Sequence, residues 1–149
     1  MKRSAWVALV MLLTSVMFLS GCSKDPVKIV SAKLVDNIDK GSGNFDRMLQ
    51  ICFDKPISSD YYHTVVIVTQ QNFKLSGGNT IRPLASDPDN KCMLRNLYNY
   101  INKDSPMGAR QMIKDYMTPG NISQVLIKIY DEKPEGKELP IAQALFKNL

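Results

Sequence analysis

Apolar and polar residues alternate with a period of two over much of the chain after residue 26, and this pattern predicts β-strands. The segment VKIVSAKLV alternates regularly, and YYHTVVIVT is dominated by β-branched and aromatic residues, which favour strands. Ala144 leaves a brief helix as the alternative for the last segment. The predicted strands are residues 27–35, 48–53, 61–69, 125–130 and 139–146.

Residues 70–84, QQNFKLSGGNTIRPL, predict a hairpin whose bend is the SGGN sequence at positions 76–79. Two further segments follow the period of a helix. In residues 92–101, Leu94, Leu97, Tyr98 and Ile101 share one helical face. Residues 105–120 begin with a Ser-Pro pair suited to a helix start and end at Pro-Gly.

Five to seven strands joined by mostly short connections predict a mainly β fold, namely an antiparallel β-sandwich with one or two short helical insertions. Two cysteines on separate strands make this arrangement similar, as an analogy of class, to immunoglobulin-like domains. The buried Trp typical of those domains has no counterpart, because Trp6 precedes the strands.

The first residues have a different pattern. Lys2 and Arg3 precede an almost wholly apolar run, and small residues follow it, as in a secretory signal peptide. The run is shorter than the roughly 20 residues of a membrane span, so a permanent anchor helix is the weaker alternative. A signal removed as residues 1–21 leaves 128 of the 149 residues.

The sequence LSGC at positions 19–22 resembles the lipobox of bacterial lipoproteins, in which a Leu and two small residues precede an invariant Cys. All four positions match: Leu19, Ser20, Gly21 and Cys22. The resemblance implies cleavage before Cys22, diacylglycerol on its sulfur and a further acyl chain such as palmitate on its amine. An ordinary cleaved signal with a chance cysteine is the alternative.

The resemblance implies three parts: a signal peptide (1–21), a lipidated tether (22–26) and a single periplasmic β-rich domain (27–149). Lipoproteins with Asp after the Cys tend to stay in the inner membrane. Here Ser23 follows Cys22, so we expect a lipid anchor on the periplasmic face of the outer membrane, with the inner membrane as the alternative.

With Cys22 lipidated, Cys52 and Cys92 remain, and an oxidising compartment favours a disulfide between them. A metal pair or a reactive thiol is the alternative, although neither cysteine lies in a CxxC and the chain has one His. Loss of the signal lowers the basic residues from 19 to 17 against 14 acidic ones, so the formal charge falls from +5 to about +3. This spread charge does not predict nucleic-acid binding.

Few residues point to chemistry, and we assign no catalytic residue, metal ligand or cofactor. His63 lies within a predicted strand, without a nucleophile motif, and is expected at the surface or half-buried. Asp87 and Asp89 lie in a segment better explained as a turn than as a calcium loop. Two sets of residues remain open between the core and a binding face: Met107, Met112 and Met117, and Tyr61, Tyr62, Tyr98, Tyr100, Tyr116 and Tyr130.

These observations favour a non-enzymatic protein-binding module, held at the membrane by lipid and binding a protein partner through a sheet edge or a tyrosine-bearing face. It would act either in the assembly of an envelope machine or as an immunity protein that neutralises a toxin. A cell-wall or envelope enzyme and an architectural envelope lipoprotein are the alternatives.

Overall fold

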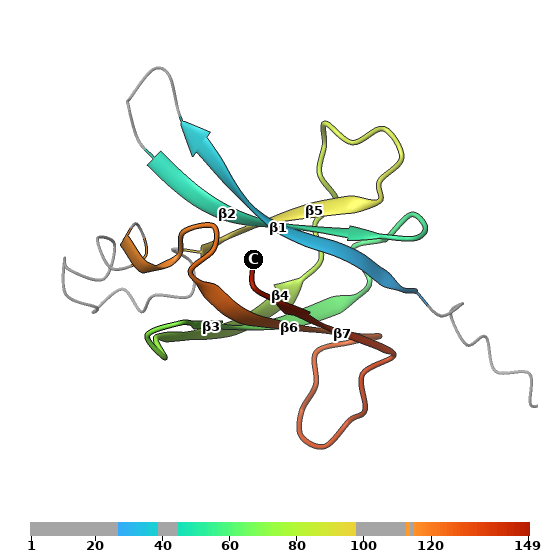
Figure 1. Cartoon of the computed structure of the whole chain (residues 1–149). Helices are drawn as coiled ribbons and strands as arrows, with labels where there is room; N and C mark the ends of the chain where they lie inside the picture. The colour runs from blue at the N-terminus through green and yellow to red at the C-terminus, as the bar shows by residue number, and fades with distance from the viewer. Residues whose placement is uncertain (1–26, 39–44, 98–112, 114) are drawn as a thin grey trace, which may run out of the picture.

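Two antiparallel β-sheets form the protein (Figure 1). The computed structural model describes residues 27–38, 45–97, 113 and 115–149. The three-stranded sheet has the order β1-β2-β5, and the four-stranded sheet has the order β4-β3-β6-β7. The strands are β1 (Ile29–Ile38), β2 (Phe45–Phe53), β3 (Tyr62–Thr69), β4 (Lys74–Thr80), β5 (Cys92–Asn96), β6 (Ile122–Tyr130) and β7 (Ala142–Lys147).

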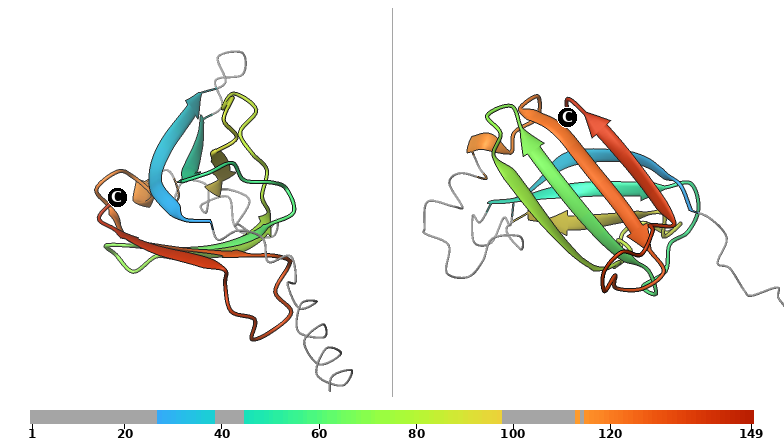
Figure 2. Two further views of the ribbon diagram at one scale, coloured as in Figure 1. Left: turned by 90° about the vertical axis from the view of Figure 1, so that its right-hand side faces the viewer. Right: turned by 90° about the horizontal axis from the view of Figure 1, so that it is seen from below.

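The two sheets face each other as the layers of a β-sandwich, which confirms the predicted fold class. Their strands cross in projection (Figure 2, right), and the β1 edge of one sheet approaches the β7 edge of the other. Strands β1 and β2, β3 and β4, and β6 and β7 are antiparallel neighbours in sequence as well as in space. Residues 54–61 and 81–91 carry the chain from one sheet to the other.

The core lies between the sheets and follows from the alternation along each strand. In β3, every second residue from His63 to Thr69 is buried, whereas the residues between them are partly exposed. Strand β2 buries Leu49, Ile51 and Phe53 against this face. The β6 core residues are Ile122, Val125, Ile127 and Ile129, with an irregularity in the β3–β6 register between the first two.

A buried arginine attaches the segment before β6 to the three-stranded sheet. Arg47 in β2 is 7% exposed, and its Nε donates to Oδ1 of Asp36 in β1 at 2.8 Å. Its Nη1 donates to the backbone oxygen of Met117 at 2.8 Å, and Met117 itself donates to Ile113 through its backbone N–H. The acid Asp36 therefore neutralises a buried cation.

Only the end of the second predicted helix lies in the described part of the chain. Ile113, Asp115 and Tyr116 are helical, and Ile113 is fully buried. The remainder of that prediction, and residues 98–101 of the first predicted helix, lie outside the described residues. Among the described residues, no helix has the length and apolar character needed to cross a membrane.

The first predicted helix is wrong over residues 92–96, which form strand β5. Cys92 lies opposite Cys52 in the register with β2, and Met93 lies opposite Ile51. Met93 faces the core and is 2% exposed, so pairing with a long neighbouring strand has overridden the helical spacing of the leucines.

The predicted bend at positions 76–79 is also wrong. These four residues lie inside β4, where Gly77 and Gly78 pair with Val65 and Thr64 of β3. The turn comes earlier, at Gln70 to Asn72, and Asn72 adopts the left-handed conformation with φ 62° that an asparagine tolerates.

Strand boundaries differ from the predictions mainly by extension. Strand β1 continues through residues 36–38, past the predicted strand 27–35, and β2 begins at Phe45, before the predicted strand 48–53. Strand β6 starts at Ile122, three residues before the predicted start. Strand β7 starts at Ala142, three residues after the predicted start at Leu139, which lies in the preceding loop and is 87% exposed. Ala144 is in the strand and not in a helix, as the main prediction had it.

Gly78 is needed because its neighbours leave no room for a side chain. A Cβ atom at this position would lie 2.6 Å from the backbone oxygen of His63 and 2.8 Å from Cε1 of Tyr62. The Tyr62 ring therefore packs across the glycine in the edge strand β4.

Gly78→Ala is expected to lower the free energy of unfolding by about 1–3 kcal/mol, because the backbone oxygen of His63 cannot move without disturbing the β3–β4 pairing. Urea denaturation measures the change. Gly136→Ala is the matched control, since no atom lies within 4 Å of its Cβ position. Equal stability of the two variants would contradict this account of Gly78.

Candidate functional site

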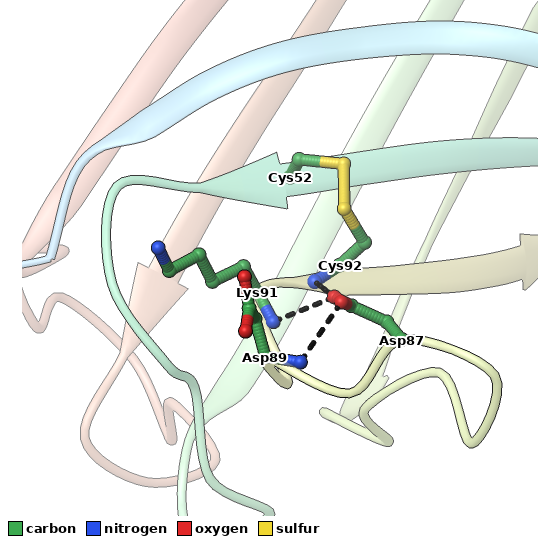
Figure 3. Close-up of a disulfide and its surroundings, with 5 residues drawn as sticks. All are labelled: Cys52, Asp87, Asp89, Lys91 and Cys92. Atoms are coloured by element: carbon green, nitrogen blue, oxygen red, sulfur yellow. Dashed lines mark hydrogen bonds between the residues drawn. A yellow bond between two sulfur atoms is a disulfide. The ribbon is translucent and has the colours of Figure 1, made fainter.

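The structure contains the predicted disulfide between Cys52 of β2 and Cys92 of β5 (Figure 3). The two residues are directly opposite in the antiparallel register, with a Cα–Cα distance of 4.1 Å. Ile51 and Phe53, which flank Cys52, point into the core, so the disulfide lies on the outer face of the three-stranded sheet. It joins neighbours within one sheet, whereas the disulfide of immunoglobulin-like domains joins the two sheets.

Asp87 organises the turn that leads into Cys92. Its Oδ2 accepts hydrogen bonds from the backbone N–H groups of Lys91 and Cys92, both at 2.7 Å, and its Oδ1 accepts from Asp89 at 3.2 Å (Figure 3). Desolvation raises the pKa of Asp87, but these donors together hold it below its usual value. The prediction of a turn at this position is confirmed.

A pocket of about 290 Å³ opens where the end of β5 lies near β3 and β4. Two strands of the four-stranded sheet contribute His63, Asn79 and Thr80, and the other sheet contributes residues from β2 and β5. Arg82 lies in the connection between the sheets. The described lining residues are Met48, His63, Asn79, Thr80, Arg82, Met93, Leu94, Arg95 and Asn96.

His63 is fully buried, which corrects the expectation of a surface or half-buried residue. The cause is its place in β3: it has the same strand parity as Val65 and Ile67, which face the core. Neither ring nitrogen has a hydrogen-bond partner in the described part of the chain. Such an imidazole is a buried polar group whose hydrogen-bonding capacity is unused.

Burial, and to a smaller extent the positive charge of Arg95, lower the pKa of His63 from 6.5 to about 4. The backbone of Asn79, opposite His63 in β4, opposes this shift without reaching hydrogen-bonding geometry with either ring nitrogen. The imidazole is therefore neutral at neutral pH, with one nitrogen that donates and one that accepts.

The side chain of Asn79 presents its amide NH₂ group as a donor, because its oxygen is already engaged. Oδ1 of Asn79 accepts from the backbone N–H of Thr80 at 2.8 Å and from the hydroxyl of Thr80 at 3.3 Å. Arg82 is exposed and Arg95 half-buried, so the pocket wall combines positive charge with donors. The described lining residues include no carboxylate and no thiol.

A second feature is the outer face of the four-stranded sheet, which carries apolar and aromatic residues. Tyr62 lies opposite Tyr130 in the β3–β6 register, and both are partly exposed. One row across three strands consists of Val66, Leu126 and Leu145. Leu145 is 51% exposed, so this outer-face row is accessible to a partner.

Other predicted candidates divide between the core and the surface. Met117 is fully buried, and Tyr61 packs against the core. Tyr116 is 38% exposed, with its ring centroid 6.4 Å from that of Phe73. Outside the described residues lie Leu19, Ser20, Gly21, Cys22, Asp39, Tyr98, Tyr100, Met107 and Met112.

Among the described residues, no group of three or more His, Cys, Asp or Glu side chains is placed to hold a metal ion. No protein-family model matches the chain, and no curated protein or solved structure matches it.

Proposed function

We propose that the protein is a lipid-anchored lipoprotein of the Gram-negative envelope whose β-sandwich binds a protein partner without catalysing a reaction. The observation that carries the binding role is the outer-face row Val66, Leu126 and Leu145. The Tyr62–Tyr130 pair lies on the same face, beyond a polar row of Thr64, Lys128 and Gln143. The outer face of an antiparallel sheet is ordinarily polar, so an accessible apolar row supports a docking surface.

Two features support the envelope location. The LSGC sequence resembles a lipobox, which implies a diacylglycerol and an acyl chain such as palmitate at Cys22. The Cys52–Cys92 disulfide suits an exported, oxidising compartment. Ser23 favours the periplasmic face of the outer membrane over the inner membrane. Two or more acyl chains hold a protein firmly to a bilayer, whereas one holds it only marginally.

The short connection from the lipidated residue to the domain limits where the docking face can reach. Residues 22–27 can span at most about 18 Å when fully extended. The domain would thus remain close to the membrane surface. A partner would be an envelope protein or a secreted protein that passes near that surface, and it would present an apolar patch to Leu145.

Intact-mass spectrometry tests the anchor. The mature protein is expected to begin at Cys22 and to carry the mass of a diacylglyceryl group plus an amide-linked acyl chain. Cys22→Ala is expected to leave uncleaved or mislocalised precursor, seen by membrane fractionation. A mature protein with an unmodified Cys22 would refute the anchor but leave the docking face untouched.

Photo-crosslinking in cells tests the partner. A photoreactive residue at position 145 is expected to capture one defined protein, and the same residue at position 139 is the control, since Leu139 is also exposed but lies in the β6–β7 loop. Leu145→Glu is expected to weaken purified binding by about tenfold or more, with Leu139→Glu unchanged. Loss of binding in both variants, or in neither, would contradict this docking surface.

The identity of the captured protein separates the two biological roles. A secretion or pilus component supports an assembly factor, and a secreted effector supports an immunity protein.

A further inference from the structure

The pocket beside His63 lies on the inner side of β3, whereas the outer-face row lies on the other side of the same sheet. The two features are therefore separate surfaces. The pocket also sits between the two sheets, since its lining comes from β3 and β4 on one side and β2 and β5 on the other. A ligand of this pocket would therefore be distinct from the protein that binds the outer-face row.

The described lining residues of the pocket carry charge of one sign. Two of its described lining residues, Arg82 and Arg95, carry a permanent positive charge, and none is acidic. A guanidinium presents donors in a planar fork that matches a carboxylate or a phosphate. The wall therefore attracts an anion and offers it directional hydrogen bonds.

The neutral groups of the pocket extend this donor set. His63 is fully buried and has two ring nitrogens without a partner in the described part of the chain. Thr80 already occupies the amide oxygen of Asn79, so the NH₂ group is the part of this amide that can serve a ligand. A polar group bound in the pocket would accept from the exposed NH₂ group of Asn79 and would lie beside the buried imidazole of His63.

The remaining described lining residues are apolar except for Asn96, and the space is small. Met48, Met93 and Leu94 contribute apolar surface, and methionine side chains adapt to ligand shape. A volume of about 290 Å³ lies at the lower end of the range for small-molecule sites, roughly 300–1,000 Å³. This size suits a ligand with a short apolar chain rather than a large metabolite.

We propose that this pocket binds the carboxylate of a small amphipathic acid, with Arg82 and Arg95 holding the carboxylate and Met48 and Met93 contacting the apolar chain. The carboxylate class covers a free short-chain acid and the C-terminal residue of a peptide. A more strongly hydrated phosphate leaves the apolar half of the pocket unused, so the apolar lining favours a carboxylate bearing a chain.

His63 is the only histidine in the chain, so its imidazole gives a single magnetic resonance signal. The experiment uses the full lipoprotein in detergent micelles, labelled with ¹³C at histidine. Hexanoate is expected to shift the His63 signal saturably, and 1-hexanol, which has the same chain without the charge, is not. A bound anion stabilises the protonated imidazole, so hexanoate should also raise the pKa of His63.

Arg82→Gln and Arg95→Gln are each expected to weaken hexanoate binding by about tenfold, as loss of a charge-assisted hydrogen bond does. Lys147→Gln, which removes an exposed cation from β7, is the matched control and should bind as the wild type does. Arg82 is exposed, so Arg82→Gln keeps the test valid if Arg95→Gln disturbs folding. Arg82→Lys should bind with intermediate affinity, because it keeps the charge but not the fork.

A saturable shift with hexanoate but not with 1-hexanol supports the proposal. Equal shifts with both ligands, no saturable shift, or unchanged binding by both arginine variants would overturn it. Inorganic phosphate that binds more tightly than hexanoate would overturn the carboxylate class. A peptide with a free C-terminus that binds more tightly than hexanoate, and its amidated form that does not bind, would identify the source of the carboxylate. Each outcome is independent of crosslinking at Leu145.

Discussion

Replacing both Cys52 and Cys92 by alanine is expected to lower the free energy of unfolding by about 4 kcal/mol. The two cysteines are 40 positions apart, and their bond removes conformations of that long loop from the unfolded chain. Urea denaturation of the oxidised wild type and of the double variant measures the difference. Because net stabilities are commonly 5–15 kcal/mol, a loss of this size brings the domain near its unfolding threshold.

The same comparison in the presence of a reductant is the control. Reductant should destabilise the wild type to nearly the level of the double variant and leave the double variant unchanged. Cys22 is retained in both proteins, so this residue does not contribute to the difference. If the double variant is as stable as the oxidised wild type, the disulfide does not constrain the unfolded state as proposed.

Acidification from pH 7 to pH 4 is expected to reduce stability through His63 by roughly 3 kcal/mol, since one pKa unit corresponds to about 1.4 kcal/mol. The folded protein lowers the pKa of His63 from 6.5 to about 4. Between these values the unfolded chain binds a proton that the folded protein does not, so stability falls as the pH falls through this window. Below about pH 4 both states are protonated, and the effect of His63 levels off.

His63→Leu isolates this effect, because it removes the imidazole and places an apolar side chain in a core position. The variant should lose less stability than the wild type between pH 6.5 and pH 4, as measured by denaturation at several pH values. Carboxyl groups, including Asp87, titrate in both proteins and cancel in the difference. Parallel pH profiles would show that His63 keeps an ordinary pKa in the folded protein.

Single elements of the fold were predictable where the local sequence pattern was strong. Strand β3 is dominated by β-branched and aromatic residues, so its existence and, to within one residue, its extent followed from YYHTVVIVT. The disulfide followed from counting, because only Cys52 and Cys92 remain after Cys22 is assigned to lipid. Which strands they join did not follow, since the register of β2 with β5 depends on the whole three-stranded sheet.

Two local patterns, the spacing of the leucines after Cys92 and the glycine pair at 77–78, led to wrong predictions because each pattern is compatible with two structures. The spacing of Leu94 and Leu97 is that of a helix, but pairing with β2 determines the conformation of residues 92–96. Adjacent glycines commonly form a bend, but Gly78 is needed for the close approach of the Tyr62 ring. Close packing by a residue distant in sequence cannot be read from the glycine itself.

The residues of the pocket were also predictable only in part. The sequence did contain an indication that His63 is buried, because it lies two and four residues before the core residues Val65 and Ile67 and therefore on the same face of β3. The polar residues near it in the sequence led instead to the prediction of a surface or half-buried position. Nothing in the sequence indicated that Arg82 and Arg95 share a pocket, because each is an isolated basic residue. The connection from β4 back to β5 brings them to one pocket, and only the topology reveals this.

The position of β3 in the sheet has a consequence for the order in which the chain folds. Its neighbour β4 follows within a few residues, and the Cys52–Cys92 loop that contains both strands is complete by residue 92. Its other neighbour, β6, begins only at Ile122. Until β6 is available, an apolar strand therefore has one unpaired edge, and a chaperone that shields strand edges would matter most in that interval.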